Sequence, residues 1–411
     1  MLEIHRLSYV ILLFTALILS GALLSGCSES LRAAKTWENA LPNDPNDPTS
    51  NRPKEIEITR INPLDNNNMP RQAALPAVKV GILLPLSGQN AALGNSMLQA
   101  AQMALFEMGY ENFELIPRDT KGNASGASAA AQSAIDNGAQ ILLGPVFADS
   151  VRAAKAAAAP RRINVIAFST DWTLAGDNAF LMGFMPFAQV ERVTAYAVQK
   201  GHKNFGLIAP MDKYGDAAAK EFEKNVLGSG NQITRQLRFV SGTNDLSTQI
   251  EAFAQNPAPM DAVFIPVGGL TAETIASTLS FHGITPDKAI RIGTGLWEDD
   301  RLAREKNLSG AIFAGPSPRM HSEFERRYQN LYNEKPVRLA SLAYDATALT
   351  AVLAKSGNAS FDRAAIMNRN GFIGTDGIFR FKSNGLVDRG LSVMEYKRGA
   401  IIEVAPAPTR F

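Results

Sequence analysis

The sequence has few of the residues that usually build disulfide frameworks or metal sites. Among its 411 residues there is one cysteine, Cys27, and the four histidines lie far apart in the chain. A disulfide framework or a cysteine-rich metal site within one copy is therefore excluded. Lys and Arg number 41 against 39 for Asp and Glu, and the two signs are interspersed. This balance indicates neither a nucleic-acid-binding stripe nor a polybasic membrane patch.

Signatures of nucleotide binding and catalysis are missing as well. Gly81 and Gly88 flank a strand-to-loop junction, but no Gly-Lys-Ser/Thr follows, so a phosphate-binding P-loop is excluded. No G-x-G-x-x-G opens a helix after a strand, and neither a G-x-S-x-G elbow nor H-E-x-x-H is present. The acidic run Glu298–Asp300 is more typical of a helix N-terminus than of a metal site. The sequence therefore predicts no enzyme, no cofactor and no metal.

Residues 1–27 have the features of a targeting segment. Tyr9–Leu19 is an apolar run with the length of a signal-peptide core, and it is short for a membrane span. Leu24–Cys27, L-S-G-C, resembles a bacterial lipobox, which implies cleavage before Cys27 and attachment of lipid to it. The alternative is an uncleaved anchor with an incidental cysteine. Ser28 in place of Asp implies, by the same resemblance, sorting to the outer membrane.

Residues 28–77 read as a disordered tether. Turn-forming residues are repeated in Pro42–Pro48, P-N-D-P-N-D-P, and polar residues dominate the rest of the segment. Such a segment has too little apolar surface to fold alone. We expect it to separate the membrane anchor from a folded part that begins at Val78.

From Val78 onward, apolar segments of strand length alternate with amphipathic segments of helix length. Val78–Leu84 is predicted as the first buried strand, and a helix follows over Asn90–Met108, ended by Gly109. The alternation continues to 182 and begins again at 187. It predicts an α/β fold with parallel sheets and right-handed crossovers. Because the chain is too long for one core, we expect two similar Rossmann-like lobes.

Three proline- or glycine-containing bends are candidates for crossings between these lobes, and each is a hinge candidate. Ordinary loops remain the alternative. The predicted crossings are Phe184–Phe187, Ala314–Pro318 and Gly374–Gly377. They assign residues 78–185 and 316–375 to an N-terminal lobe and residues 186–315 and 376–405 to a C-terminal lobe.

A small-ligand cleft is predicted at the carboxyl ends of the strands, where open α/β sheets bind their ligands. The loops there combine aromatic side chains, hydroxyl groups and helix N-termini, which suits a small ligand. The alternative is that the aromatic residues only seal the contact between lobes. The candidate cleft residues are Ser87, Gly88, Phe147, Ala148, Ser150, Ser169, Thr170, Trp172, Tyr214, Gly269, Trp297 and Glu298.

Several of these segments resemble a known family. V-G-I-L-L-P-L-S-G-Q-N-A-A-L-G from Val80, L-L-G-P-V from Leu142, N-V-I-A-F-S-T from Asn164 and K-Y-G from Lys213 resemble type I periplasmic binding proteins of the leucine-binding kind. The resemblance covers about 78–405 and implies two lobes joined by a three-segment hinge.

The lipobox, the tether and the ending G-T-D-G-I-F-R-F-K-S-N-G-L-V-D-R-G-L, 374–391, together resemble the penicillin-binding protein activator lipoproteins, the LppC/YraM-like group. That group implies a non-catalytic outer-membrane lipoprotein that contacts a penicillin-binding protein and regulates peptidoglycan synthesis. Enterobacterial members carry a helical-repeat N-terminal domain, where this chain has only the tether.

The predicted site departs from amino-acid receptors of this fold. Their carboxylate-binding hydroxyl corresponds to Ala148 here, with Ser150 as a nearby substitute, whereas Thr170 matches the next hydroxyl position. Their ammonium-binding acid falls near Gly295, with Glu298 three residues away. An unpaired charge on a bound zwitterion costs on the order of 2–5 kcal/mol, so tight binding of a free amino acid is not expected.

Two functions follow as hypotheses. The first is the regulator of peptidoglycan synthesis, acting from the periplasmic face of the outer membrane. The second is a lipid-anchored solute-binding protein for an amino-acid or amide-type ligand of an ABC transporter, with Trp172, Tyr214 and Trp297 as walls of the ligand site.

Overall fold

The first lobe is built on a parallel sheet that contains the first predicted strand, Val78–Leu84. The computed structural model describes residues 77–355 and 360–411, so the predicted targeting segment, Cys27 and nearly all of the tether lie outside the described residues. The order of the strands in the sheet of the first lobe is β2-β1-β3-β4-β5. Every pairing is parallel, as the alternating pattern predicts. The strands are β1 (Val78–Leu84), β2 (Phe113–Asp119), β3 (Ile141–Leu143), β4 (Asn164–Ala167) and β5 (Ala179–Leu181).

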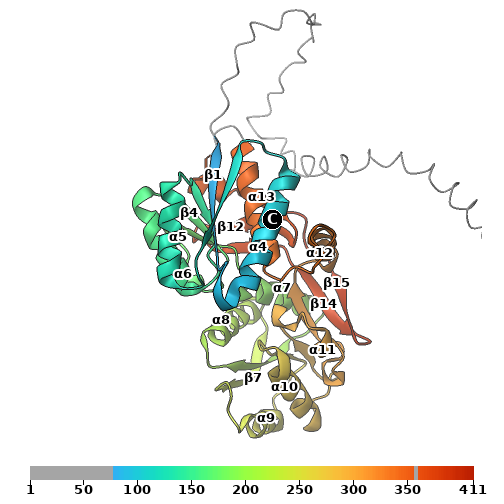
Figure 1. The fold of residues 1–411 in the computed structure, drawn as a ribbon. Helices are drawn as coiled ribbons and strands as arrows, with labels where there is room; N and C mark the ends of the chain where they lie inside the picture. Colours follow the sequence, from blue (N-terminus) through green and yellow to red (C-terminus); the bar gives the residue numbers. More distant parts are fainter. Residues whose placement is uncertain (1–76, 356–359) are drawn as a thin grey trace, which may run out of the picture. The chain divides into compact units, whose positions relative to one another are not determined.

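Helices cover both faces of this sheet. α5 (Ala124–Asp136) and α6 (Ala148–Ala158) pack side by side, and α4 (Ala91–Met108) packs against α13 (Ala340–Lys355) (Figure 1). α4 ends at Gly109 in the left-handed conformation, φ 55°, as predicted. A Cβ at Gly94 would lie 2.0 Å from the Pro85 carbonyl oxygen, so glycine lets α4 approach the loop after β1.

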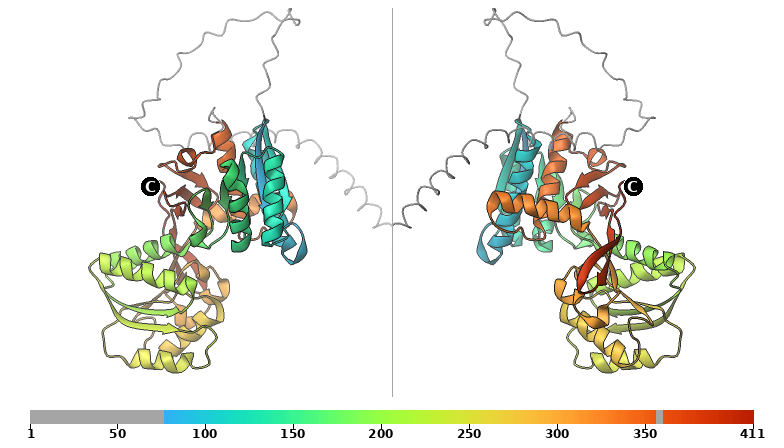
Figure 2. Two further views of the ribbon diagram at one scale, coloured as in Figure 1. Left: turned by 90° about the vertical axis from the view of Figure 1, so that its left-hand side faces the viewer. Right: turned by 90° about the vertical axis from the view of Figure 1, so that its right-hand side faces the viewer.

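The second lobe is built on a larger, mixed sheet of order β15-β14-β10-β9-β8-β6-β7. α7 (Pro186–Gln199) and α8 (Lys213–Gly228) pack on one face, and α9 (Leu246–Gln255) and α10 (Gly269–Phe281) on the other (Figure 2). β14 and β15 pair antiparallel and form one edge. The strands are β6 (Asn204–Pro210), β7 (Gln232–Phe239), β8 (Ala262–Phe264), β9 (Ile290–Ile292), β10 (Ile312–Gly315), β14 (Ser392–Lys397) and β15 (Ala400–Ala405).

A third, antiparallel sheet corrects one predicted crossing. It consists of β11 (Phe372–Gly374), β12 (Gly377–Phe381) and β13 (Val387–Arg389). Gly374–Gly377 is the turn of the β11–β12 hairpin, not a passage between lobes. Phe379, Phe381 and Val387 lie in the core of the first lobe, so the third passage to the second lobe lies between β13 and β14. The predicted boundary at 375/376 is therefore wrong, because β12 and β13 belong to the first lobe. The glycines serve a tight turn, which the sequence pattern does not distinguish from a hinge.

The other two passages occur at the predicted bends. After β5 the chain enters α7, whose first residue is Pro186, and after β10 it enters α12 (Pro318–Tyr332). Both prolines stand at the first helical position, where the missing N–H is not needed. Within the described part of the chain, no helix has the length and apolar character needed to cross a membrane.

Candidate functional site

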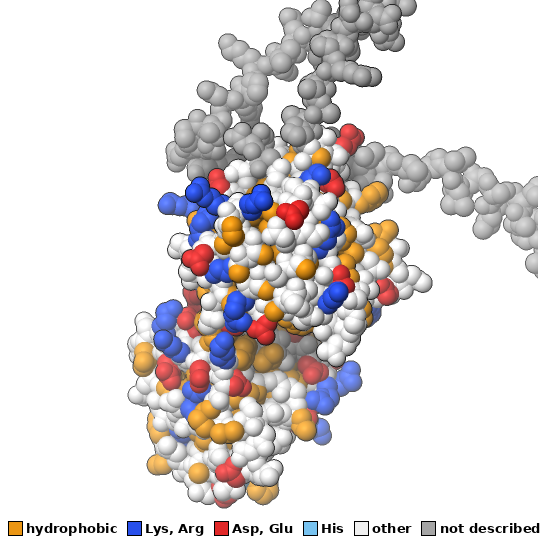
Figure 3. All heavy atoms as spheres, turned by 60° about the vertical axis from the view of Figure 1, so that its left-hand side comes forward, with side chains coloured by type: hydrophobic (Ala, Val, Ile, Leu, Met, Phe, Trp, Pro, Cys, Tyr) orange, Lys and Arg blue, Asp and Glu red, His pale blue; other side chains and the backbone are white. Residues whose placement is uncertain are grey.

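Loops at the carboxyl ends of the parallel strands of both sheets meet between the lobes. Asp171, which follows β4 in the first lobe, lies 3.3 Å from Lys213 at the start of α8 in the second. This ion pair brings Ser169, Thr170 and Trp172 to the same side as Tyr214. Figure 3 shows a recess between the lobes, with hydrophobic side chains inside it and charges of both signs around its rim. The ion pair between Asp171 and Lys213 thus joins a loop of the first lobe to the start of α8 in the second.

The loop after β1 is fixed by one carboxylate. Asp119, at the end of β2, accepts hydrogen bonds from the Ser87 hydroxyl at 2.6 Å and the Leu86 amide at 2.9 Å. Burial alone would raise the pKa of Asp119, but bonds from Ser87, Lys121 and Leu86 outweigh it and lower the pKa. Gly88 is exposed and has φ 75°, which favours glycine. The predicted rim residues Ser87 and Gly88 thus occupy a rigid turn.

The loop after β3 leads into a helix that no side chain caps. The sequence around Asp149 and Ser150 predicts that one of them caps this helix, but α6 begins at Ala148 with Phe147 as its N-cap, and no side chain caps it. Asp149 instead pairs with Arg152 at 2.5 Å, and Ser150 is fully buried. Among the described residues the Ser150 hydroxyl has no hydrogen-bond partner. The first-turn amides of α6 therefore remain without a side-chain acceptor.

The loop after β4 supplies an aromatic wall. The Trp172 ring is half-buried and meets the Phe187 ring edge-on, with centroids 5.4 Å apart. The Ser169 hydroxyl accepts a hydrogen bond from the Asp171 amide at 3.1 Å, whereas Thr170 is exposed. Thr170 is therefore accessible to solvent.

In the second lobe, Tyr214 is half-buried and its hydroxyl is fixed by a hydrogen bond. It donates a hydrogen bond to the Thr294 hydroxyl at 2.9 Å. Burial raises the pKa of Tyr214 to about 12, so the phenol stays neutral at physiological pH. Gly269 is the first residue of α10 and has φ 56°. Gln189 of α7 accepts from the Gly295 amide at 2.7 Å and positions the loop after β9.

Trp297 is a core residue, which corrects its predicted place in the cleft. It is fully buried, its indole N–H donates to the Val267 carbonyl at 2.6 Å, and its ring stacks on Tyr396. A Cβ at Gly293 would lie 2.1 Å from the indole, so the ring occupies the space that this glycine leaves. The sequence predicts a ligand wall at this loop position because the space beside Gly293, which the indole fills, is visible only in the folded structure.

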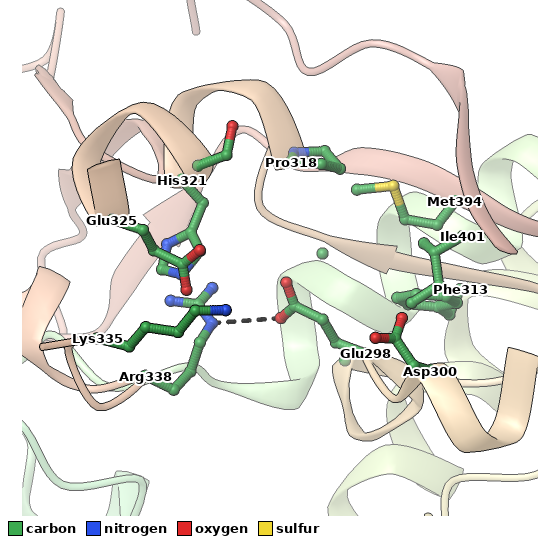
Figure 4. Close-up of a pocket in the computed structure, with 13 residues that line it drawn as sticks. Glu298, Asp300, Phe313, Pro318, His321, Glu325, Lys335, Arg338, Met394 and Ile401 are labelled. Carbon is green, nitrogen blue, oxygen red and sulfur yellow. Dashed lines mark hydrogen bonds and ion pairs between the residues drawn. The ribbon is translucent and has the colours of Figure 1, made fainter. Parts of the chain in front are cut away.

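Glu298, the remaining predicted residue, lines a different cavity, here named the hinge-side pocket. Its volume is about 570 Å³, and the passage residues Gly315 and Pro318 form part of its wall. Figure 4 shows His321, Glu325, Lys335 and Arg338 on one side, with Glu298 and Asp300 facing them from the other. Sequence reasoning missed this pocket, since its charged residues stand on elements that are distant in the chain.

A buried carboxylate lies beneath this pocket. Asp376 accepts hydrogen bonds from the Ser341 hydroxyl at 2.6 Å and Arg338 at 3.2 Å, and it lies 2.8 Å from His321 Nδ1. Burial would raise the pKa of Asp376, but the neighbouring Arg338, His321 and Arg389 outweigh it and hold that pKa well below its ordinary range. The only signal for this residue in the sequence is the turn G-T-D-G.

A second buried carboxylate, that of Asp345, has fewer hydrogen-bond partners than that of Asp376. Asp345 in α13 accepts from the Thr375 amide at 2.7 Å through one oxygen, whereas the other oxygen has no partner among the described residues. Burial, and then repulsion by Asp376, raises the pKa of Asp345 to about 7. Arg389, also buried, donates to the Met182 carbonyl at 2.8 Å. These groups join α13, the third sheet and the end of β5.

The acidic run at 298–300 behaves as a helix start. Asp299 is the N-cap of α11 (Asp300–Ala303), and its side chain accepts from the Arg301 amide at 2.7 Å. Within the part of the chain that the structure describes, no group of three or more His, Cys, Asp or Glu side chains is arranged to hold a metal ion.

Comparisons with known proteins agree with this architecture. Residues 77–400 match the family described as "Periplasmic binding protein". Three solved structures share the fold. A putative branched-chain amino acid ABC transporter protein from Rhodospirillum rubrum is 19% identical, with a TM-score of 0.69 over 80% of this chain and 100% of that one.

The other two are ligand complexes. The branched-chain amino acid transporter substrate-binding protein LivJ of Streptococcus pneumoniae, in complex with isoleucine, is 21% identical, with a TM-score of 0.57 over 81% of this chain and 100% of that one. A Rhodopseudomonas palustris solute-binding protein in complex with benzoate is 17% identical, with a TM-score of 0.56 over 81% and 97%. An uncharacterized protein of Rickettsia prowazekii is 22% identical over 157 residues, which are 38% of this chain and 42% of that protein.

Proposed function

Because the chain belongs to the periplasmic binding protein family, whose members bind ligands rather than catalyse reactions, we propose that it is a solute-binding protein for a small organic acid. The ligand would lie in the cleft between the lobes. The observation that carries this proposal is the uncapped N-terminus of α6 after β3, at the same sheet edge as the exposed Thr170 after the neighbouring parallel strand β4. Free amides at a helix N-terminus, with the positive end of its dipole, form a binding site for a carboxylate.

The walls of the cleft suit an apolar or aromatic body on that acid. Phe147, Trp172 and Tyr214 are half-buried, so each keeps part of its ring accessible. Ligand sites of this kind combine an apolar lining with a few polar groups that fix the orientation. Two of the structural neighbours are complexes with isoleucine and with benzoate, both of which carry a carboxylate.

An acid without an ammonium group is the better candidate. Glu298, the acid nearest the position expected to hold an ammonium, is paired with Arg338 at 3.3 Å. Ala148 stands where a second carboxylate-binding hydroxyl is expected. We therefore rank an aromatic or aliphatic acid above a free amino acid.

Calorimetric titration of the full-length chain in mild detergent tests this proposal. The probes are benzoate, 3,4-dihydroxybenzoate and isoleucine. We expect at least one aromatic acid to bind more tightly than isoleucine, and Trp172→Ala to weaken that binding about tenfold, since a pair of aromatic rings contributes about 0.5–1.5 kcal/mol beyond the apolar area that it buries. Phe281→Ala, on an exposed ring remote from the cleft, is the matched control. No binding of any probe would overturn the proposal.

Anchoring by lipid on Cys27 is a second part of the proposal, and it rests on the sequence of residues 24–27. Cys27→Ser should abolish incorporation of a palmitate analogue and release the chain from the membrane fraction. Ser28→Asp should move the anchored protein from the outer to the inner membrane. Retention of label in the Cys27→Ser variant would contradict the lipid assignment.

Regulation of a penicillin-binding protein is the second candidate function. The favouring observation is that the lobes are joined by their own side chains, through Asp171–Lys213 and Glu298–Arg338. Such contacts can present a fixed surface to a protein partner. Crosslinking of the full-length chain in the envelope, followed by identification of a bifunctional penicillin-binding protein, tests this candidate. Recovery of the chain without any such synthase would count against it.

A further inference from the structure

The end of β13 carries a buried arginine that lacks hydrogen-bond acceptors. Only 7% of the surface of Arg389 is exposed, and its Nη2 atom donates a hydrogen bond to the Met182 carbonyl. Its Nε and Nη1 atoms are buried and have no hydrogen-bond partner among the described residues. Because buried charges in proteins are normally paired, these two donors favour an acceptor that carries negative charge.

The neighbouring carboxylates and rings do not supply this acceptor. Asp376 has three other side-chain partners, and Asp345 accepts from a backbone amide. Within the described part of the chain, neither carboxylate forms an ion pair with Arg389. The Phe184 and Phe379 rings lie 5.1 and 5.6 Å from the guanidinium carbon and attract its charge, but they offer no lone-pair acceptor.

The guanidinium lies at a small pocket at the start of α7, here named the α7 pocket. Its wall includes Phe184, Met185, Ala188, Gln189 and Arg389. α7 has 14 residues, no side chain caps its N-terminus, and Pro186 at its first position has no N–H. The other amides of the first turn have no acceptor within the helix. The positive end of a helix dipole and an unpaired arginine therefore meet at one pocket.

We propose that the α7 pocket binds a small inorganic monoanion, for which chloride is the probe. The volume of the pocket is about 10 Å³, close to what one water-sized particle needs. An amino acid, an organic acid or a phosphate is too large for this space. None of the residues in its wall belongs to the hinge-side pocket or to the candidate cleft residues. The proposal therefore does not rest on the proposed function of the cleft.

The bound ion would connect two of the three passages between the lobes. Arg389 ends β13, just before the passage to β14, and the N-terminus of α7 ends the passage from β5. Gln189 also lines the pocket, and its Oε1 atom accepts from the Gly295 amide at 2.7 Å, which leaves its Nε2 donor for the ion. An ion held by these three groups would stiffen the hinge that the passages form.

Thermal unfolding of the full-length chain in mild detergent tests the proposal. The probes are sodium chloride and sodium gluconate at equal ionic strength, so that general screening is the same and the size of the anion differs. We expect Tm to be about 2–4 °C higher in chloride, because an ion that binds only the folded state stabilises it. The chloride NMR signal should also broaden as the protein is added, which reports binding directly.

Two variants assign the effect to the α7 pocket. Arg389→Met removes the guanidinium, whereas Gln189→Glu supplies a carboxylate in place of the ion and keeps an acceptor for the Gly295 amide. Both should abolish the chloride effect on Tm and the broadening. In gluconate, Gln189→Glu should melt at least as high as the unaltered protein. Arg326→Met, on the exposed face of α12, is the matched control and should keep the full chloride effect.

The outcomes decide between an ion, a water molecule and a site elsewhere. Equal Tm values in the two salts, without broadening, overturn the anion site and leave water as the occupant. A chloride effect that persists in Gln189→Glu places the ion elsewhere and equally overturns the proposal, even if Arg389→Met does not fold. Titration with benzoate is independent of these results, so the function of the cleft is judged separately.

Discussion

The guanidinium of Arg338 in the first lobe lies 3.3 Å from the carboxylate of Glu298 in the second, so this ion pair joins the two lobes. The same guanidinium stacks on the Phe184 ring, 4.4 Å from its centroid, at the passage between the lobes. On its other side it pairs with Asp376, whose side chain is completely buried. One arginine thus connects the hinge, the second lobe and the buried charges of the first lobe.

Replacing Arg338 should destabilise the protein strongly. Arg338→Met leaves Asp376 buried with fewer partners, and breaking a buried pair in this way costs about 3–5 kcal/mol. Glu298→Gln removes only the partly exposed partner and should cost less than about 1 kcal/mol. Urea unfolding followed by circular dichroism measures both, with Arg326→Met on the exposed face of α12 as the control. Equal losses for Glu298→Gln and Arg338→Met would contradict the assigned importance of Asp376.

The sequence could predict the sheets but not these charges. β1, α4 and α9 follow from apolar periodicity and from stops such as Gly109, because these signals are local. The charged groups of His321, Arg338, Asp345, Asp376 and Arg389 come from α12, the segment before α13, α13 itself, the β11–β12 turn and β13, and they converge only after α12, α13 and the third sheet have packed. In the sequence each looks like an ordinary surface charge. The prediction that Trp297 lines the cleft is wrong for a related reason. The space beside Gly293 that the ring fills appears only in three dimensions.

Stability should fall as the pH rises from about 4 to about 7, because of Asp345. Its pKa is raised from 3.8 to about 7 in the folded protein. Between these values the folded state holds a proton that the unfolded state has lost, so the free energy of unfolding decreases with pH by up to about 1.4 kcal/mol per pH unit. Asp376 has a lowered pKa and acts in the opposite direction, but only below about pH 4.

Asp345→Asn tests this assignment because its amide does not titrate. Urea unfolding at pH values from 4.5 to 8 should give a flatter dependence in the variant than in the unaltered protein. Asp136→Asn, on the exposed surface of α5, should leave the slope as it is. A slope that Asp345→Asn does not change would refute the role of this carboxylate.

Variants of Trp297 and Trp172 should separate stability from binding. Trp297→Ala removes a fully buried ring and should cost about 3–5 kcal/mol. Trp172→Ala removes a half-buried ring and should cost less than half as much, while it weakens binding of an aromatic acid. Melting temperature and calorimetry on both variants make the comparison. If Trp297→Ala lowered affinity in a protein of unchanged stability, Trp297 would belong to the ligand site after all.

Removing the hydroxyl of Ser150 should stabilise the protein. This group is fully buried and has no hydrogen-bond partner among the described residues. A buried polar group left unpaired costs about 1–3 kcal/mol, so Ser150→Ala should raise the free energy of unfolding by about 1 kcal/mol. Ser341→Ala is the matched control, since Ser341 donates to Asp376 at 2.6 Å and its loss should destabilise. A destabilised Ser150→Ala variant with weaker binding of an acid would instead show that Ser150 serves the ligand, as the substitute hydroxyl for Ala148.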